Sequence, residues 1–185
     1  MSSHTKIIED KAQHYRILKM PVFRKTPGVI FDLVPLVLIP NISAIDRVIH
    51  SSEAFSPGPV GNVERPWYMH THQADNLVVL QGVRFVELYS MKTGELEKFE
   101  VGPDYIKKNG EPFYKGGCML TWPTNVFHRI ISGPQGSASI NFASHREGID
   151  MRTNFNIYSL DQKTGKFDVL RYGYEDQDFD KNSKT

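Results

Sequence analysis

Short apolar runs separated by turn residues extend along most of the chain. Residues 77–80 are continuously apolar and lead to Gly82, a pattern typical of a strand buried on both faces. In residues 95–101, apolar and charged positions alternate with the period of a half-exposed strand. Residues 154–160 and 166–172 flank a polar turn and predict a hairpin. About ten strands at this spacing predict an all-β protein, built as an antiparallel jelly-roll barrel.

The two ends of the chain have different patterns. Residues 1–28 begin with a polar stretch and predict an N-terminal extension with a short helical or extended segment. Residues 29–39 fit one or two strands bent at Pro35, and residues 102–115 a polar loop. We therefore expect one barrel domain over residues 29–172, with its C-terminal hairpin. Residues 173–185 are charged and nearly free of apolar side chains, which predicts a disordered tail.

Charge and composition exclude several classes of partner. The formal net charge is +1, from 22 basic and 21 acidic residues, and no basic block stands out. Nucleic-acid or anionic-membrane binding needs clustered Lys and Arg, so we expect neither partner. The most apolar segment, residues 29–40, is interrupted and too short to span a bilayer, and the N-terminus lacks a secretory signal. A cytoplasmic protein with a small-molecule substrate is the expectation, and the single cysteine, Cys118, is expected in the core.

Three histidines are candidate metal ligands. His70 and His72 are separated by one residue, and in a regular strand such residues project from the same face. His128 follows the apolar residues 118–122 and a turn at Pro123. If the later strand lies against the earlier one, three imidazoles can bind one metal ion.

The surrounding residues resemble the paired motifs of the cupin superfamily. The first family motif is His-x-His, then Glu, then a buried strand that ends in Gly. Asp75 occupies the glutamate position here, behind a shortened loop. The second motif is Gly, five residues, Pro-x-Gly, two residues, His, and residues 117–128 fit it with Asn125 in place of glycine. Asn is the usual substitute where a turn needs a positive φ.

The resemblance implies a cupin barrel, also described as a double-stranded β-helix, and a metal centre inside it. The expected ligands are His70, His72 and His128, with Asp75 as a possible fourth. Three imidazoles suit a divalent transition metal such as Fe, Zn, Mn or Ni, and the sequence does not choose among them. Three protein ligands leave open positions for substrate, which is the mark of a catalytic metal.

Two further residues are candidates for catalysis. Tyr68 alternates to the same face as His70 in a regular strand, so we expect it to face the site. Arg65 lies just before it and offers a bidentate partner for a carboxylate or phosphate, although an exposed arginine without a role fits equally well.

The leading functional hypothesis is a metal-dependent enzyme of oxygenase, isomerase or lyase type that acts on a small organic substrate. One alternative is a metal-independent enzyme similar to the deoxysugar 3,5-epimerases of the wider cupin group, in which a histidine acts as base and a tyrosine as acid. Those enzymes usually have a lysine where Asn76 stands, which counts against it. Another alternative is a non-catalytic cupin that binds a sugar or other small ligand. The resemblance also implies a homodimer, because N-terminal strands of cupins often pack on a second subunit.

Overall fold

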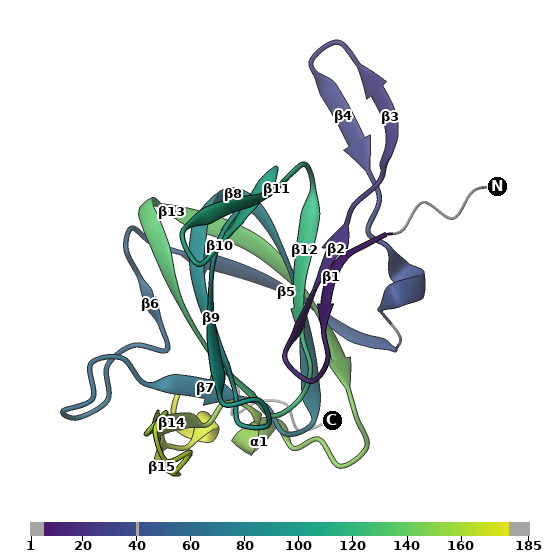
Figure 1. The fold of residues 1–185 in the computed structure, drawn as a ribbon. Helices are drawn as coiled ribbons and strands as arrows, with labels where there is room; N and C mark the ends of the chain where they lie inside the picture. The colour runs from purple at the N-terminus through teal and green to yellow at the C-terminus, as the bar shows by residue number, and fades with distance from the viewer. Residues whose placement is uncertain (1–5, 40, 178–185) are drawn as a thin grey trace, which may run out of the picture.

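The computed structural model describes residues 6–39 and 41–177, and strands dominate this part of the chain (Figure 1). In chain order the strands are β1 (Ile7–Lys11), β2 (Tyr15–Lys19), β3 (Val22–Thr26), β4 (Val29–Asp32), β5 (Ile42–His50), β6 (Phe55–Ser56), β7 (Trp67–Met69), β8 (Gln73–Ser90), β9 (Glu95–Gly102), β10 (Tyr105–Lys108), β11 (Glu111–Lys115), β12 (Cys118–Trp122), β13 (Val126–His145), β14 (Ile157–Leu160) and β15 (Phe167–Arg171). The helical elements are η1 (Leu36–Leu38), α1 (Met151–Asn154) and η2 (Gly173–Glu175). None of these described helices has the length or apolarity to cross a membrane.

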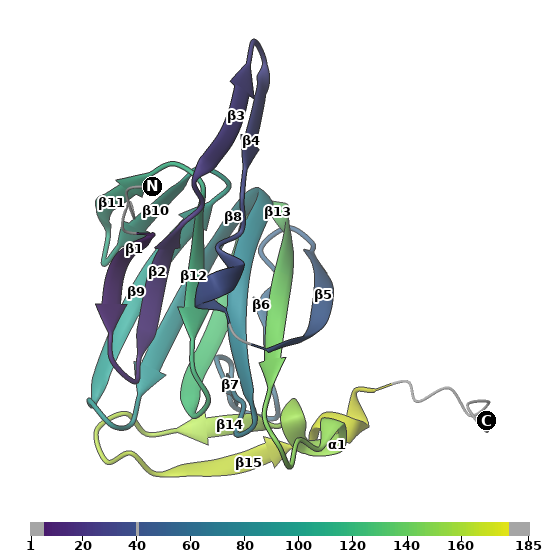
Figure 2. The same cartoon turned by 90° about the vertical axis from the view of Figure 1, so that its right-hand side faces the viewer.

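The long strands β8 and β13 organise the barrel. They pair antiparallel from Gln73 opposite His145 to Ser90 opposite Val126, with breaks in register near the middle. One end of β8 also pairs with β12, whereas the other end pairs with β9. Each long strand therefore contributes to both layers of an antiparallel jelly roll, as Figures 1 and 2 show. The expected fold class, an all-β antiparallel jelly-roll barrel, is confirmed.

The glycine and asparagine of the two motifs have the backbone conformations expected of them. Gly82 has φ +70°, and a Cβ there would overlap the carbonyl oxygen of Gly136. Asn125 has φ +65°, the left-handed conformation in which asparagine substitutes for glycine. The turns that end the two motif strands are thus fixed by residue type.

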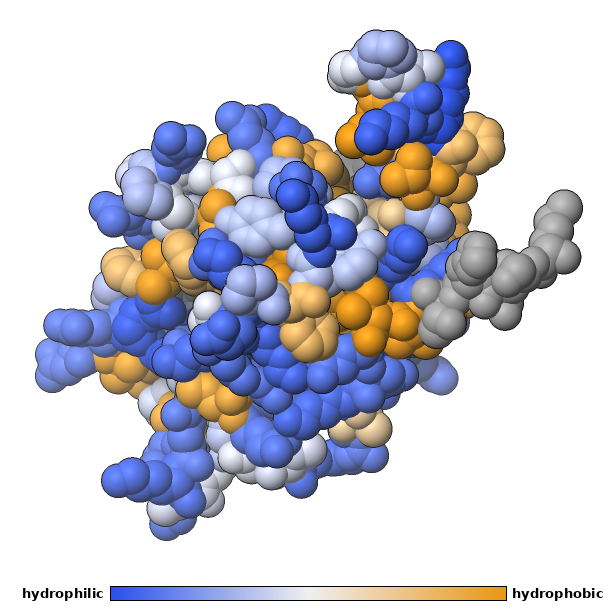
Figure 3. All heavy atoms as spheres, turned by 45° about the horizontal axis from the view of Figure 1, so that its top comes forward, coloured by the Kyte–Doolittle hydropathy of each residue, from blue (hydrophilic) through white to orange (hydrophobic). Residues whose placement is uncertain are grey.

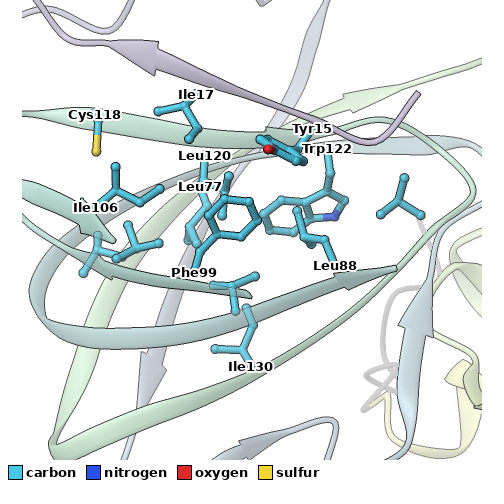
Figure 4. Close-up of a cluster of buried hydrophobic side chains, with 14 residues drawn as sticks. Tyr15, Ile17, Leu77, Leu88, Phe99, Ile106, Cys118, Leu120, Trp122 and Ile130 are labelled. Carbon is cyan, nitrogen blue, oxygen red and sulfur yellow. The ribbon is translucent and has the colours of Figure 1, made fainter. Parts of the chain in front are cut away.

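An apolar core fills part of the barrel. Its side chains come from β2, β8, β9, β10, β12 and β13 (Figure 4). Tyr15 and Phe99 meet edge to face, with ring centroids 4.8 Å apart. Cys118 is buried here as expected, and burial raises the pKa of its thiol to about 12. Because Leu77, Trp122 and Ile130 of this core also line a cavity, the remaining interior space adjoins the apolar packing.

The N-terminal segment is extended rather than helical. β1 and β2 form a hairpin, and β2 pairs with β12, which adds the hairpin to the main sheet. Residues 29–39, expected as one or two strands, form β4 followed by the turn η1. β3 and β4 make a separate two-stranded sheet that projects from the barrel in Figures 1 and 2.

The predicted C-terminal hairpin is present as β14 and β15. β14 also pairs with β7, which places the hairpin beside the strand that leads to His70. Residues 102–115, expected as a loop, instead contain the paired strands β10 and β11. Of the expected disordered tail, residues 173–177 include η2, and residues 178–185 lie outside the described chain. The proposed division at residues 28 and 172 stays a prediction.

Candidate active site

His70 and His72 lie in a bend and not in a strand. β7 ends at Met69 and β8 begins at Gln73, so the alternation of side chains is interrupted between them. His70 is buried and lines the barrel cavity. His72 is half-buried outside it, where its Nδ1 lies 2.8 Å from the Thr71 hydroxyl. The expectation that both imidazoles face the same site is therefore wrong for His72.

A compact cluster of His70, Asp75 and His128 forms in place of the three-histidine centre. All three side chains are buried, and one nitrogen or oxygen atom from each lies within 4.8 Å of those of the other two. The ring centroids of His70 and His128 are 4.9 Å apart. The Nε2 atom of His70 lies 3.5 Å from Oδ2 of Asp75. Strands β8 and β13 bring Asp75 and His128 into the interior from separate motifs.

Both imidazoles of the cluster are oriented by backbone carbonyls. Nδ1 of His70 contacts the carbonyl oxygen of Asn154, and Nδ1 of His128 lies 3.3 Å from the carbonyl oxygen of Val126. A carbonyl oxygen can only accept, so in each ring Nδ1 carries the hydrogen. Nε2 is then the unprotonated nitrogen of each neutral ring, and it is the atom available for accepting a proton.

Asp75 is held by two amide side chains. Gln73 Nε2 and Asn141 Nδ2 donate to its Oδ1 over 2.7 and 2.8 Å, and Asn154 Nδ2 in turn donates to Gln73 Oε1 over 2.8 Å. Oδ2 accepts no hydrogen bond from the described residues and faces His70. Burial alone would raise the pKa of Asp75, but the electrostatic interactions with the His70 and His128 rings and these amide donors lower it overall. Asp75 is therefore an anion at neutral pH.

His128 is kept neutral. Its pKa is lowered to about 4, mainly by burial and also by the proximity of His70, against the opposing effect of Asp75. Trp122 packs against this ring, with centroids 5.2 Å apart. The cluster thus combines one fixed carboxylate with a neutral imidazole in an aromatic environment.

Tyr68 faces the cluster, as expected. Its ring centroid lies 6.4 Å from that of His70 and 5.9 Å from that of His128. The hydroxyl group donates to none of the described residues, and burial raises its pKa, so it remains protonated at neutral pH. Phe155 meets His70 edge to face at 5.2 Å. A phenol and an imidazole with an unprotonated nitrogen therefore share one cavity.

The cavity has a volume of about 380 Å³ and extends beyond the cluster. Its other polar walls include Asp46 and His50 from β5 and Arg84 from β8. Arg65 is not among the lining residues, because its guanidinium lies over the ring of Phe55, 4.8 Å from the centroid. The structure thus brings Tyr68 to the site and leaves Arg65 away from it.

Comparisons with known proteins find solved structures of similar fold. No family model matches the sequence, and no curated protein matches it significantly. The RmlC epimerase of Mycobacterium tuberculosis is 10% identical, with a TM-score of 0.55 over 78% of this chain and 70% of that one. The 4-keto-6-deoxy sugar epimerase NovW of Streptomyces spheroides is 9% identical, with a TM-score of 0.55 over 79% and 71%. QdtA of Thermoanaerobacterium thermosaccharolyticum, a sugar 3,4-ketoisomerase solved with TDP, is 12% identical, with a TM-score of 0.53 over 74% and 84%.

The chain has the fold of these epimerases and ketoisomerases. The hypothesis of an enzyme that works through a divalent metal held by three histidines is wrong. His72 does not reach the other two imidazoles, and the similar structures are sugar epimerases and ketoisomerases, which favour the alternative of an enzyme similar to the deoxysugar epimerases. The local reason is the bend at residues 70–72, which a strand pattern does not reveal.

Several residues of the site were missed from the sequence. Asn154 and Phe155 follow the barrel strands and carried no motif, although they anchor and cover His70. Asn141 lies on a stretch in which polar and apolar residues alternate, and that alternation is the signal that could have placed it inside. Gln73 follows His72 directly in the chain, and its side-chain amide positions Asp75.

Proposed function

We propose that this protein is a sugar epimerase or ketoisomerase that removes and returns a proton at a carbon next to a carbonyl group. The supporting observation is the His70–Asp75 pair, which is buried in a cavity that also contains the phenol of Tyr68. General acid–base chemistry requires such a pair within reach of one bound substrate. The substrate class is a keto sugar, and the similar structures support a nucleotide-linked one.

His70 is the proposed base. Its Nδ1 hydrogen is engaged by the Asn154 carbonyl, which leaves Nε2 to accept the proton from the substrate carbon. The imidazolium that forms has the anionic Oδ2 of Asp75 3.5 Å away, and in a buried cavity this charge stabilises it. Gln73 and Asn141 keep Asp75 in place, so the carboxylate does not need to reorganise during the reaction.

Tyr68 is the proposed acid. Loss of the proton leaves an enolate, to whose carbon the phenol donates a proton; donation to the opposite face inverts that centre. The tyrosinate then regains a proton from solvent, and the imidazolium of His70 releases one. No step in this scheme uses a metal. Asn76, at the position of the usual lysine, donates to the carbonyl oxygen of Phe142 and does not line the cavity, so this chain differs there from the epimerases.

The experiment is hydrogen exchange with solvent. The purified protein is incubated in D₂O with TDP-4-keto-6-deoxyglucose and with a keto sugar that carries a carboxylate, and deuterium is located by NMR. We expect incorporation next to the carbonyl in at least one substrate, loss of incorporation in His70→Asn, and slow incorporation in Tyr68→Phe. Thr71→Ala, in the same bend but outside the cavity, is the control. Binding without exchange in any substrate would favour a non-catalytic sugar-binding protein.

A homodimer is proposed as the assembly. Apolar side chains are exposed on the β3–β4 hairpin and the segment after it (Figure 3), and also on the outward face of β5. Phe23 is 71% exposed and Val37 82% exposed. A two-stranded sheet is marginally stable by itself, and an apolar patch of this kind favours contact with a second copy of the chain.

The cytoplasmic localisation expected from the sequence stays a prediction.

A further inference from the structure

Arg84 is a buried arginine in the wall of the cavity. It is 2% exposed and is the largest of the fully buried side chains. Its Nε donates to Ser137 Oγ and its Nη2 to the Val48 carbonyl oxygen, both over 3.1 Å. Both acceptors are neutral, and no carboxylate of the described residues lies within ion-pair distance of it. A buried guanidinium without an anionic partner is unfavourable unless something else supplies the charge.

Some N–H donors of the Arg84 guanidinium are not used in hydrogen bonds to the described residues. It carries five N–H groups, and two nitrogen atoms use one hydrogen each on Ser137 and Val48. Nη1 donates to no described residue, and it is not completely enclosed by protein atoms. Burial lowers the pKa of Arg84 to about 10, so the group remains a cation at neutral pH. The free N–H groups therefore face cavity space with their charge intact.

The neighbouring polar groups of the cavity do not neutralise this charge. His50 Nδ1 is buried without a hydrogen-bond partner, and burial together with the charge of Arg84 lowers the pKa of this ring to about 4. Asp46 lines the same cavity, but its Oδ2 accepts from Asn141 and it forms no ion pair with Arg84. A neutral imidazole and an unpaired guanidinium together make a site for an oxyanion.

We propose that Arg84 binds a carboxylate of the substrate, so that the sugar is a sugar acid rather than a neutral deoxysugar. A carboxylate brings one negative charge and two oxygens, which match the fork of one guanidinium. A phosphate dianion would bring a second charge into a cavity that already contains Asp46 and Asp75. The identity of the ligand as a sugar rests on the proposed function, whereas recognition of the carboxylate does not require turnover.

The test is ligand-detected NMR binding of D-glucuronate, D-glucose and inorganic phosphate at one pH. We expect glucuronate to bind the wild-type protein at least tenfold more tightly than glucose, and Arg84→Gln to remove that preference. Arg47→Gln is the matched control, because Arg47 lies on β5 beside Val48 but on the exposed face, and the preference should be unchanged. Circular dichroism checks that each variant is folded.

Each alternative outcome overturns the proposal. An equal response to glucuronate and glucose, including no binding of either, contradicts it, as does a preference that survives Arg84→Gln. Arg84-dependent binding of phosphate that is tighter than that of glucuronate rejects the carboxylate. If Arg84→Gln does not fold, Arg84→Lys replaces it, and a preference undiminished by loss of the fork overturns the proposal. Deuterium exchange and carboxylate preference are measured separately, so either can fail without the other.

Discussion

The backbone N–H of Asn125 donates a hydrogen bond to the carbonyl oxygen of His70 over 2.8 Å. This bond joins the turn of the second motif to the bend of the first, directly behind the imidazole that lines the cavity. Asn125 makes it from a left-handed conformation, with φ +65°. The asparagine that replaces the motif glycine thus holds the proposed base in place.

Asn125→Gly is expected to keep stability and exchange activity, because glycine adopts this φ freely. Asn125→Val is expected to lower the free energy of unfolding by about 1–3 kcal/mol, since a β-branched residue is strained there. Urea unfolding measures both changes. Equal stability of the glycine and valine variants would show that the turn does not need its observed conformation.

Asp75→Asn is expected to slow deuterium exchange by about 100-fold or more, because it removes the anion beside the imidazolium of His70. Substrate affinity should change much less, since the proposed effect lies in the proton-transfer step. Asp168→Asn, an exposed change of the same kind on β15, is the control. Exchange rates and binding of the keto sugar separate the two effects, and an unchanged rate in Asp75→Asn would contradict the assigned role.

Stability is expected to fall as the pH decreases from about 6.5 to about 4. The pKa of His128 is about 4 in the folded protein, below its ordinary value of about 6.5, because the ring is buried. In that interval the unfolded chain binds more protons than the folded one, so unfolding becomes easier as the pH falls. Asp75, with its lowered pKa, remains ionised over this interval and adds no opposing slope.

Urea unfolding at several pH values measures this dependence. In His128→Gln, the decrease in the free energy of unfolding between pH 7 and pH 4 is expected to be smaller than in the wild-type protein, by on the order of 1–3 kcal/mol. His50, whose pKa is also about 4, should leave part of the dependence in that variant. Stability that is flat across this interval in the wild-type protein would show that His128 is not held neutral.

Removal of divalent metals is expected to leave deuterium exchange unchanged. The proposed scheme transfers protons through His70 and Tyr68 alone, and His72 lies outside the cavity. Exchange is measured before and after dialysis against a chelator, with the metal content of the protein determined in parallel. Activity that is lost on chelation and returns with one metal would restore the metal-dependent interpretation.

Size-exclusion chromatography with light scattering is expected to give the mass of a dimer. The double variant Phe23→Ser and Phe31→Ser should shift it towards the monomer, because both side chains are exposed on the projecting hairpin. Phe113→Ser, at an exposed position on β11 in the barrel, is the control and should leave the mass unchanged. A monomeric wild-type protein would contradict the proposed homodimer.

The fold was predictable because its signals are local. Turn residues such as Gly82, buried apolar runs and the alternation in residues 95–101 all follow from the period of a strand. The β10–β11 strands were missed because they are short and mix charged with apolar residues, and β10 is stabilised by pairing with both β9 and β11. Pairing with a neighbour does not require an apolar pattern, so composition alone underestimates such strands.

The site was only partly predictable. His70, His128 and Tyr68 were found because motif spacing and strand alternation place them. His72 was placed wrongly because the strand breaks at the bend, and a break of two or three residues changes the face on which a side chain lies. Arg84 carried no signal at all, since its position depends on the inward face of β8 beyond a break in register.

The contact between His70 and the Asn154 carbonyl lies across 84 positions of the chain. A polypeptide that stopped after β13 would retain the paired strands of the barrel, yet its proposed base would lack the group that sets which nitrogen is free. During synthesis, too, the barrel strands emerge before this carbonyl does. Competence for proton transfer should therefore arrive later than the barrel strands themselves.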